Sequence, residues 1–189
     1  MTRAPLQPLH LVAIGVLLLA LEAPTAGGWD LLPDPLGWVV IGVGASRLAP
    51  TPLLRPLLAL IALAGVVDAA LWVPAVLEAV AAGEEALRWT ANLPQLGAIL
   101  LLCQDLAGRA RVVGDQAALT WWRLAAGAYG VLILLPVLVF GGDVEALGPV
   151  ADTLIALVPL VLVALLLTFA TRGWAAGFDE ARPSGRADS

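Results

Sequence analysis

The chain has no lysine and very few of the residues that carry most enzyme chemistry. Its 189 residues include one cysteine, Cys103, one histidine, His10, and one tyrosine, Tyr129. A single cysteine cannot form an internal disulfide, and no cluster of Cys and His has the spacing of zinc ligands. We therefore expect neither a metal ion nor another cofactor.

Charge is also scarce. Only 13% of the residues are charged, and 60% are hydrophobic, whereas a soluble domain carries about a quarter charged residues. A chain with so little polar surface requires lipid as part of its solvent. The sequence also lacks a nucleophile–base pair, a phosphate-binding glycine loop and a zinc-protease helix motif. We therefore expect a membrane protein that is not an enzyme and does not bind nucleic acid.

Six long apolar runs follow one another without a long polar stretch between them. A helix that crosses the hydrocarbon core needs about 20 residues. The runs predict an all-α bundle of six transmembrane helices, arranged as three consecutive hairpins in a single domain over residues 1–172. Residues 173–189 are polar and are predicted to be a mostly disordered tail. The six predicted helices cover residues 9–26, 31–49, 57–82, 91–107, 118–140 and 149–171.

Arginine occurs on alternate sides of these runs. Nine of the ten arginines precede the first run, follow the sixth, or lie between the second and third or the fourth and fifth. Acidic residues collect in the other connections, with Arg88 as the exception. Short loops that are rich in arginine stay in the cytoplasm. The pattern predicts both termini in the cytoplasm. Abundant Arg, Ala, Gly and Pro suggest a G+C-rich bacterial gene, so we expect the bacterial plasma membrane.

Asp68 is the most informative single residue. It lies twelve residues into the third predicted helix, about 20 Å from Arg55 along a regular helix, which places it near the bilayer midplane. A carboxylate at that depth costs roughly 2.5–3.5 kcal/mol on insertion scales, so such residues usually face the bundle interior and find a partner. Two interpretations remain open, a proton- or cation-coupling site and a packing contact. Candidate partners are Asn92, Gln95 and Tyr129.

A second candidate site lies at the predicted outer face, before the second helix. Asp34 followed by Pro35 is a good helix start, and acidic residues lie beside it. The alternative interpretation is a tight extracellular turn. The residues of this outer-face motif are Trp29, Asp30, Pro33, Asp34 and Gly37.

The same stretch resembles a known signature. Leu32-Pro33-Asp34 followed by Leu36-Gly37-Trp38 resembles the Leu-Pro-Asp-x-Ile/Leu-Gly-Tyr/Trp motif of small polytopic membrane proteins of unknown function in Gram-positive bacteria. There the motif likewise opens the second span. The resemblance covers about the first fifty residues and implies a membrane fold but no known activity.

Two weaker patterns complete the sequence. Trp29, Leu36 and Gly37 recur as Trp89, Leu96 and Gly97 at an offset of sixty residues. This echo would fit parallel repeats of a helical hairpin, as in some transporters, but it can also arise by chance in so biased a composition. On the predicted inner face, three arginines are candidates for contacts with lipid headgroups, although topology alone explains them. These are Arg109, Arg111 and Arg123.

Composition favours a non-catalytic membrane protein, acting as an accessory subunit or scaffold. Its partners would be the lipid bilayer and either another membrane protein or a second copy of the chain. The alternative is a small transporter or channel-like protein in which Asp68 couples to a proton or cation. An acid that faces a hydrated cavity would favour transport, and one sealed against another helix would favour packing.

Overall fold

The computed structural model describes residues 6–21, 34–83, 85–141 and 148–175. These residues form α-helices and one short 3-10 turn, and no β-strand lies within these four ranges. The fold is therefore all-α over the described part of the chain. The helices are α1 (Pro8–Ala20), α2 (Asp34–Ser46), α3 (Leu54–Leu71), α4 (Pro74–Ala81), α5 (Glu85–Val112), α6 (Gln116–Gly141) and α7 (Gly148–Phe169), followed by η2 (Gly173–Ala175).

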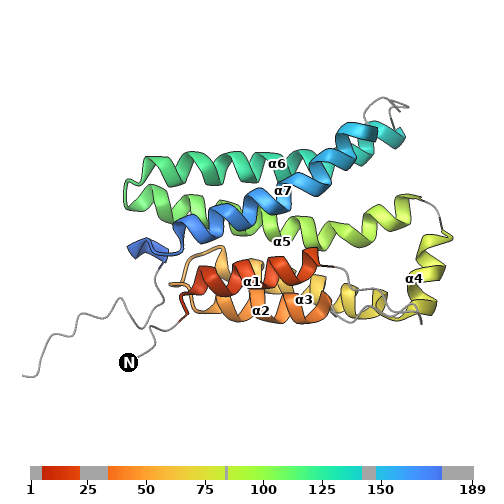
Figure 1. Cartoon of the computed structure of the whole chain (residues 1–189), viewed down its shortest axis with the longest axis horizontal. Coiled ribbons are helices and arrows are strands. Elements are labelled where there is room, and N and C mark those ends of the chain that lie inside the picture. Colours follow the sequence, from red (N-terminus) through yellow and green to blue (C-terminus); the bar gives the residue numbers. More distant parts are fainter. Residues whose placement is uncertain (1–5, 22–33, 84, 142–147, 176–189) are drawn as a thin grey trace, which may run out of the picture.

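Six of the helices form a closed ring. Helix α1 packs against α2, α2 against α3, α3 against α5, α5 against α6 and α6 against α7, and α7 returns to α1. Successive long helices run in opposite directions along the bundle (Figure 1). We call one end of the bundle the arginine end, formed by segment 47–53, the α5–α6 turn at 113–115 and η2. The other end, beside the short helix α4, is the cavity end.

Helices α1 and α2 approach closely because glycines lie at their contact. A Cβ added to Gly15 would lie 2.6 Å from the carbonyl oxygen of Gly37, and one added to Gly44 would lie 2.8 Å from that of Pro8. No side chain fits at such distances. Small residues that bring helix backbones together are typical of helix pairs in membranes, where packing replaces the hydrophobic effect as the driving force.

The sequence predicted one helix over residues 57–82, and the structure corrects this to two. Helix α3 ends at Leu71, and α4 begins at Pro74. Val73 between them is extended, with φ −78° and ψ 117°. A residue before proline avoids the helical region because of the proline ring, and proline itself fits the first position of a new helix. Helix α4 therefore turns away from the bundle axis (Figure 1).

The other helix boundaries shift by smaller amounts. Helix α5 extends the predicted helix 91–107 at both ends, because the charged residues that bounded the apolar run do not stop a helix. The predicted extensions of the first helix to residue 26 and of the second helix back to residue 31 lie outside the described residues. So do the predicted tail beyond Ala175 and the motif residues Trp29, Asp30 and Pro33.

The turn between α5 and α6 is well defined. Gly114 has φ +75°, a conformation that glycine adopts without the penalty of a Cβ. The amide of Asp115 donates to the carbonyl of Ala110 at 2.9 Å, which closes the end of α5 in a Schellman motif. The carboxylate of Asp115 then accepts from the amide of Ala118 at 3.1 Å and caps α6.

Two of the described helices are long and apolar enough to cross a membrane, namely Leu54–Leu71 and residues 116–137 of α6. Only 22% and 33% of these stretches are buried inside the protein, so most of their residues are at least partly exposed. The core helix of a soluble protein would be mostly buried. Helix α1 and residues 153–169 of α7 are also apolar but shorter. These features agree with a membrane location.

Candidate functional site: a cavity beside a buried aspartate

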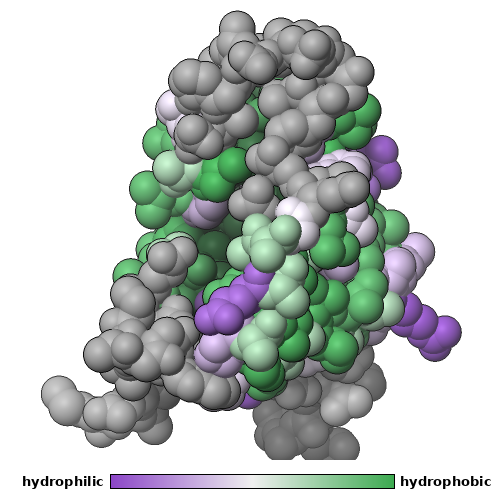
Figure 2. Space-filling model, turned by 90° about the vertical axis from the view of Figure 1, so that its right-hand side faces the viewer, coloured by the Kyte–Doolittle hydropathy of each residue, from purple (hydrophilic) through white to green (hydrophobic). Residues whose placement is uncertain are grey.

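A cavity of about 690 Å³ lies in the half of the ring toward the cavity end. Residues of α1, α2, α5, α6 and α7 line it, so it is enclosed by most of the ring. Figure 2 looks onto this end of the bundle and shows hydrophobic side chains around a recess between the helices. The volume is within the range of small-molecule sites, which are mostly apolar with a few polar groups.

Asp68 of α3 lies behind the cavity wall. Its side chain is only 4% exposed. The indole N–H of Trp38 donates to Oδ2 at 2.5 Å, and the side-chain amide of Gln95 donates to Oδ1. Trp38 and Gln95 both line the cavity, whereas Asp68 is not among its lining residues. The two donors therefore stand between the carboxylate and the cavity.

The neighbouring helices are shaped to bring these three groups together. Gly65 precedes Asp68 by three residues, on the same face of α3, and a Cβ there would lie 3.2 Å from the Cβ of Trp38. Glycine at this position lets α2 approach α3 closely enough for Trp38 to reach the acid. Gln95 comes from α5, on the other side of α3 in the ring. The contact thus joins three consecutive members of the ring.

The cavity contains further polar and aromatic groups. Trp89, Asn92 and Gln95 follow one another at intervals of three residues along α5, and Tyr129 contributes from α6. The indole nitrogen of Trp89 is buried and has no hydrogen-bond partner among the described residues. A buried indole N–H usually finds an acceptor. Trp89 therefore offers a donor at the cavity wall to an acceptor from elsewhere.

Of the partners predicted for Asp68, the structure places Gln95 in direct contact with the acid, and Asn92 and Tyr129 on the cavity wall. Trp38, the other partner of Asp68, was not among the predicted partners. A usable signal existed: an indole N–H inside an apolar helix needs an acceptor.

Two residues of the predicted outer-face motif lie in the described part of the chain. Asp34 begins α2. Gly37 is buried, and a Cβ added to it would clash with the side chain of Leu19.

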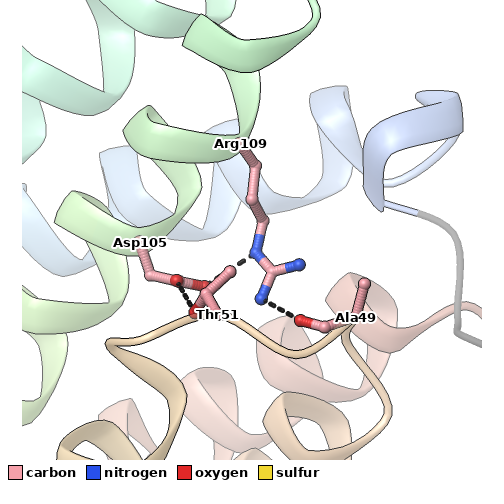
Figure 3. Close-up of polar contacts among 4 residues, drawn as sticks. All are labelled: Ala49, Thr51, Asp105 and Arg109. Atoms are coloured by element: carbon pink, nitrogen blue, oxygen red, sulfur yellow. Dashed lines mark hydrogen bonds and ion pairs between the residues drawn. The ribbon is translucent and has the colours of Figure 1, made fainter.

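A second polar cluster lies at the arginine end (Figure 3). Arg109 Nε donates to Asp105 at 2.7 Å, and Arg109 Nη2 donates to the carbonyl oxygen of Ala49, also at 2.7 Å. The hydroxyl of Thr51 donates to the other oxygen of Asp105 at 2.5 Å. Asp105 and Arg109 are 2% and 8% exposed. This cluster fastens the segment between α2 and α3 to α5. Arg109, predicted as a candidate for contacts with lipid headgroups, is thus 8% exposed and directs its guanidinium to Asp105 and Ala49.

Asp115 forms a third cluster, on the surface of the arginine end. Besides capping α6, it accepts a hydrogen bond from the indole N–H of Trp174 at 3.2 Å, and Arg172 lies 3.9 Å away. The pKa of Asp115 is lowered, mainly by the hydrogen bond from the Ala118 amide, then by the bond from Trp174, with a smaller contribution from the charge of Arg172. Trp174 also packs near Phe169, at a ring-centroid distance of 6.4 Å. These contacts hold η2 against the α5–α6 turn.

The polar groups around the cavity suit binding. An ionised carboxylate can accept about four hydrogen bonds, so the bonds from Trp38 and Gln95 leave Asp68 with capacity for a proton or a cation. No three His, Cys, Asp or Glu side chains lie together as metal ligands in the part of the chain that the structure describes.

Comparison of the chain with protein-family models, curated proteins and solved structures found no match.

Proposed function

We propose that the chain is a six-span membrane protein with both termini in the cytoplasm. We further propose that it is a small transporter whose cavity binds the solute and in which Asp68 is the coupling residue. Three features support the membrane arrangement: the alternating direction of the ring helices, the exposed apolar residues of α3 and α6, and the concentration of arginine at one end. Arginine near the ends of short loops favours the cytoplasmic side. The cavity then opens toward the outside.

The observation that carries this proposal is the position of Asp68 behind two cavity-lining donors. A buried acid within a membrane-spanning helix is costly, and such residues commonly mark pathways for ions or protons. Displacement of Trp38 or Gln95 would connect Asp68 to the cavity, because both donors line it. Its charge favours a cation or a proton as the coupled species. The aromatic rings of Trp38, Trp89 and Tyr129 provide faces that attract cations.

Flux into vesicles tests this function. The protein is reconstituted into liposomes that contain a pH-sensitive dye, and gradients of Na⁺, K⁺ or methylammonium are imposed. We expect the wild type to change the internal pH faster than empty liposomes with at least one probe, and Asp68→Asn to abolish that response. Thr120→Val is the matched control, because Thr120 is exposed on α6 near the arginine end. Wild-type flux equal to that of empty liposomes for all three probes would contradict the proposal.

A second candidate is an accessory subunit or scaffold, in which Asp68 serves packing alone. The observation that favours it is the seal around the acid: both carboxylate oxygens already accept a hydrogen bond, and the side chain is nearly inaccessible. Under this function the wild type carries no flux and copurifies with a stable membrane-protein partner. Asp68→Asn would then lower the melting temperature, because an amide replaces one acceptor oxygen with a donor that faces Trp38 or Gln95.

A further inference from the structure

A second hollow, of about 410 Å³, lies between α5 and α6 at the arginine end. We call it the arginine groove. Its α5 wall includes Gln104, Gly108 and Arg111, and its α6 wall includes Leu119 and Arg123, while Leu53 contributes from before α3. Residues three, four or seven apart share one face of a helix. Each helix therefore presents a continuous strip to the groove.

The groove brings together two arginines that have no carboxylate partner in the described part of the chain. Arg111 and Arg123 are exposed, and neither forms an ion pair within the described residues. Arg109 is different, because it is buried on another face of α5. Its charge is already neutralised by Asp105 at 2.7 Å. Two unpaired guanidinium groups on one groove favour an anion with several oxygens, because a guanidinium can donate two parallel hydrogen bonds to phosphate.

The surroundings of the groove favour a lipid over a free anion. Next to Arg123 on α6, Trp121 and Leu124 are 50% and 59% exposed. Exposed tryptophan beside arginine is typical of the membrane–water interface, where the indole lies at the level of the headgroups. Leu53 and Ala126, which are half-buried, supply apolar surface within the groove itself. An occupant with a charged phosphate and a hydrocarbon chain matches both parts.

We propose that the arginine groove binds an anionic phospholipid of the inner leaflet, with its phosphate between Arg111 and Arg123 and an acyl chain along Leu53 and Ala126. Gln104, which is exposed on the same wall, supplies a further donor to the headgroup. Basic pockets between helices on the cytoplasmic side bind such headgroups in other membrane proteins. The inference rests on the membrane arrangement proposed above but not on the role of the cavity or of Asp68.

Gly108 offers a way to close the groove without removing charge. A Cβ added there would meet nothing within 4 Å, so a side chain can start at this position without a clash and extend into the groove. Gly108→Leu therefore fills the space that a lipid would occupy and keeps both arginines. A second variant, Arg111→Gln with Arg123→Gln, removes the charges and keeps the space. Arg47→Gln with Arg55→Gln is the matched control, because both are exposed arginines at the same end but do not line the groove.

Retention of lipid by the purified protein in detergent tests the proposal. Phosphatidylglycerol, phosphatidylcholine and inorganic phosphate are titrated separately, with bound lipid counted by native mass spectrometry and the melting temperature recorded. We expect phosphatidylglycerol to bind the wild type and the control at least tenfold more tightly than the groove variants. Phosphatidylcholine and inorganic phosphate should bind all four proteins weakly.

Three results would overturn the proposal. Undiminished binding of phosphatidylglycerol by Gly108→Leu would place the lipid elsewhere. An equal loss of phosphatidylglycerol binding in the Arg47→Gln, Arg55→Gln control would show that the overall positive charge of this end, and not the groove, binds the lipid. Inorganic phosphate that binds as tightly as phosphatidylglycerol would show a site for the free anion. The assay requires no flux, so failure of the transport experiment leaves its outcome unaffected.

Discussion

Single polar residues hold the arginine end of the bundle together. Asp115 caps α6, accepts a bond from Trp174 and lies near Arg172, so one side chain connects the α5–α6 turn to η2. Toward the cavity end, Asp68 of α3 likewise connects α2 and α5 through its hydrogen bonds with Trp38 and Gln95. The two differ in surroundings, because Asp68 is buried whereas the carboxylate of Asp115 is near water. The effect of the Asp115 carboxylate on stability can therefore be tested by measuring the melting temperature at different pH values.

The lowered pKa of Asp115 predicts a loss of stability in acid. A carboxyl whose pKa is lower in the folded state than in the unfolded chain stabilises the protein above its unfolded pKa, which is about 3.9 for aspartate. That contribution disappears as the pH falls below this value through the folded pKa. Asp115→Asn keeps a good helix cap without the titration. Between pH 6 and pH 3, the melting temperature of the wild type should therefore fall further than that of Asp115→Asn. Equal losses would contradict the role assigned to this carboxylate.

At the scale of the elements, the α1–α2 pair depends most on close backbone contact. Alanine at Gly15 would place its Cβ 2.5 Å from Ile41 and 2.6 Å from the Gly37 carbonyl. Alanine at Gly130 of α6 would meet nothing within 4 Å. Both changes add the same methyl group to a helix, so they separate helix packing from helix propensity.

We expect Gly15→Ala to destabilise the protein by about 1–3 kcal/mol, the usual cost of overpacking. Gly130→Ala should be neutral or stabilise it by up to about 1 kcal/mol, because alanine favours helix more than glycine does. Melting temperatures of the two variants in the same detergent check this. Equal shifts in both would show that α1 and α2 are not in close contact.

At the scale of the whole molecule, a substantial part of the architecture could be predicted from the sequence. The apolar runs are local signals, and the described part of each is mainly helical, although only two of the described helices are long and apolar enough to cross a membrane. The apolar run continues through Pro74, so the sequence predicted one helix over residues 57–82 where the structure has two. The partners of Asp68 and Arg109 depend on residues 30 and 60 positions away, Trp38 and Ala49. Local patterns carry no information on which faces of distant helices meet, so these contacts required the three-dimensional structure.

The proposed orientation in the membrane underlies the functions assigned to both the cavity and the arginine groove. The natural cysteine is buried, so single cysteines introduced at exposed positions can be labelled selectively. Leu77 of α4 is 49% exposed beside the cavity end, and Val113 is 57% exposed at the arginine end. The two positions report on opposite ends of the bundle. Cys103→Ala provides the background for both variants.

The most direct test is therefore labelling of Leu77→Cys and Val113→Cys in intact cells with a membrane-impermeant maleimide, repeated after the membrane is permeabilised. The account predicts that Leu77→Cys reacts in intact cells and that Val113→Cys reacts only after permeabilisation. Reaction of Val113→Cys in intact cells, with or without Leu77→Cys, would contradict the orientation on which both proposed sites depend.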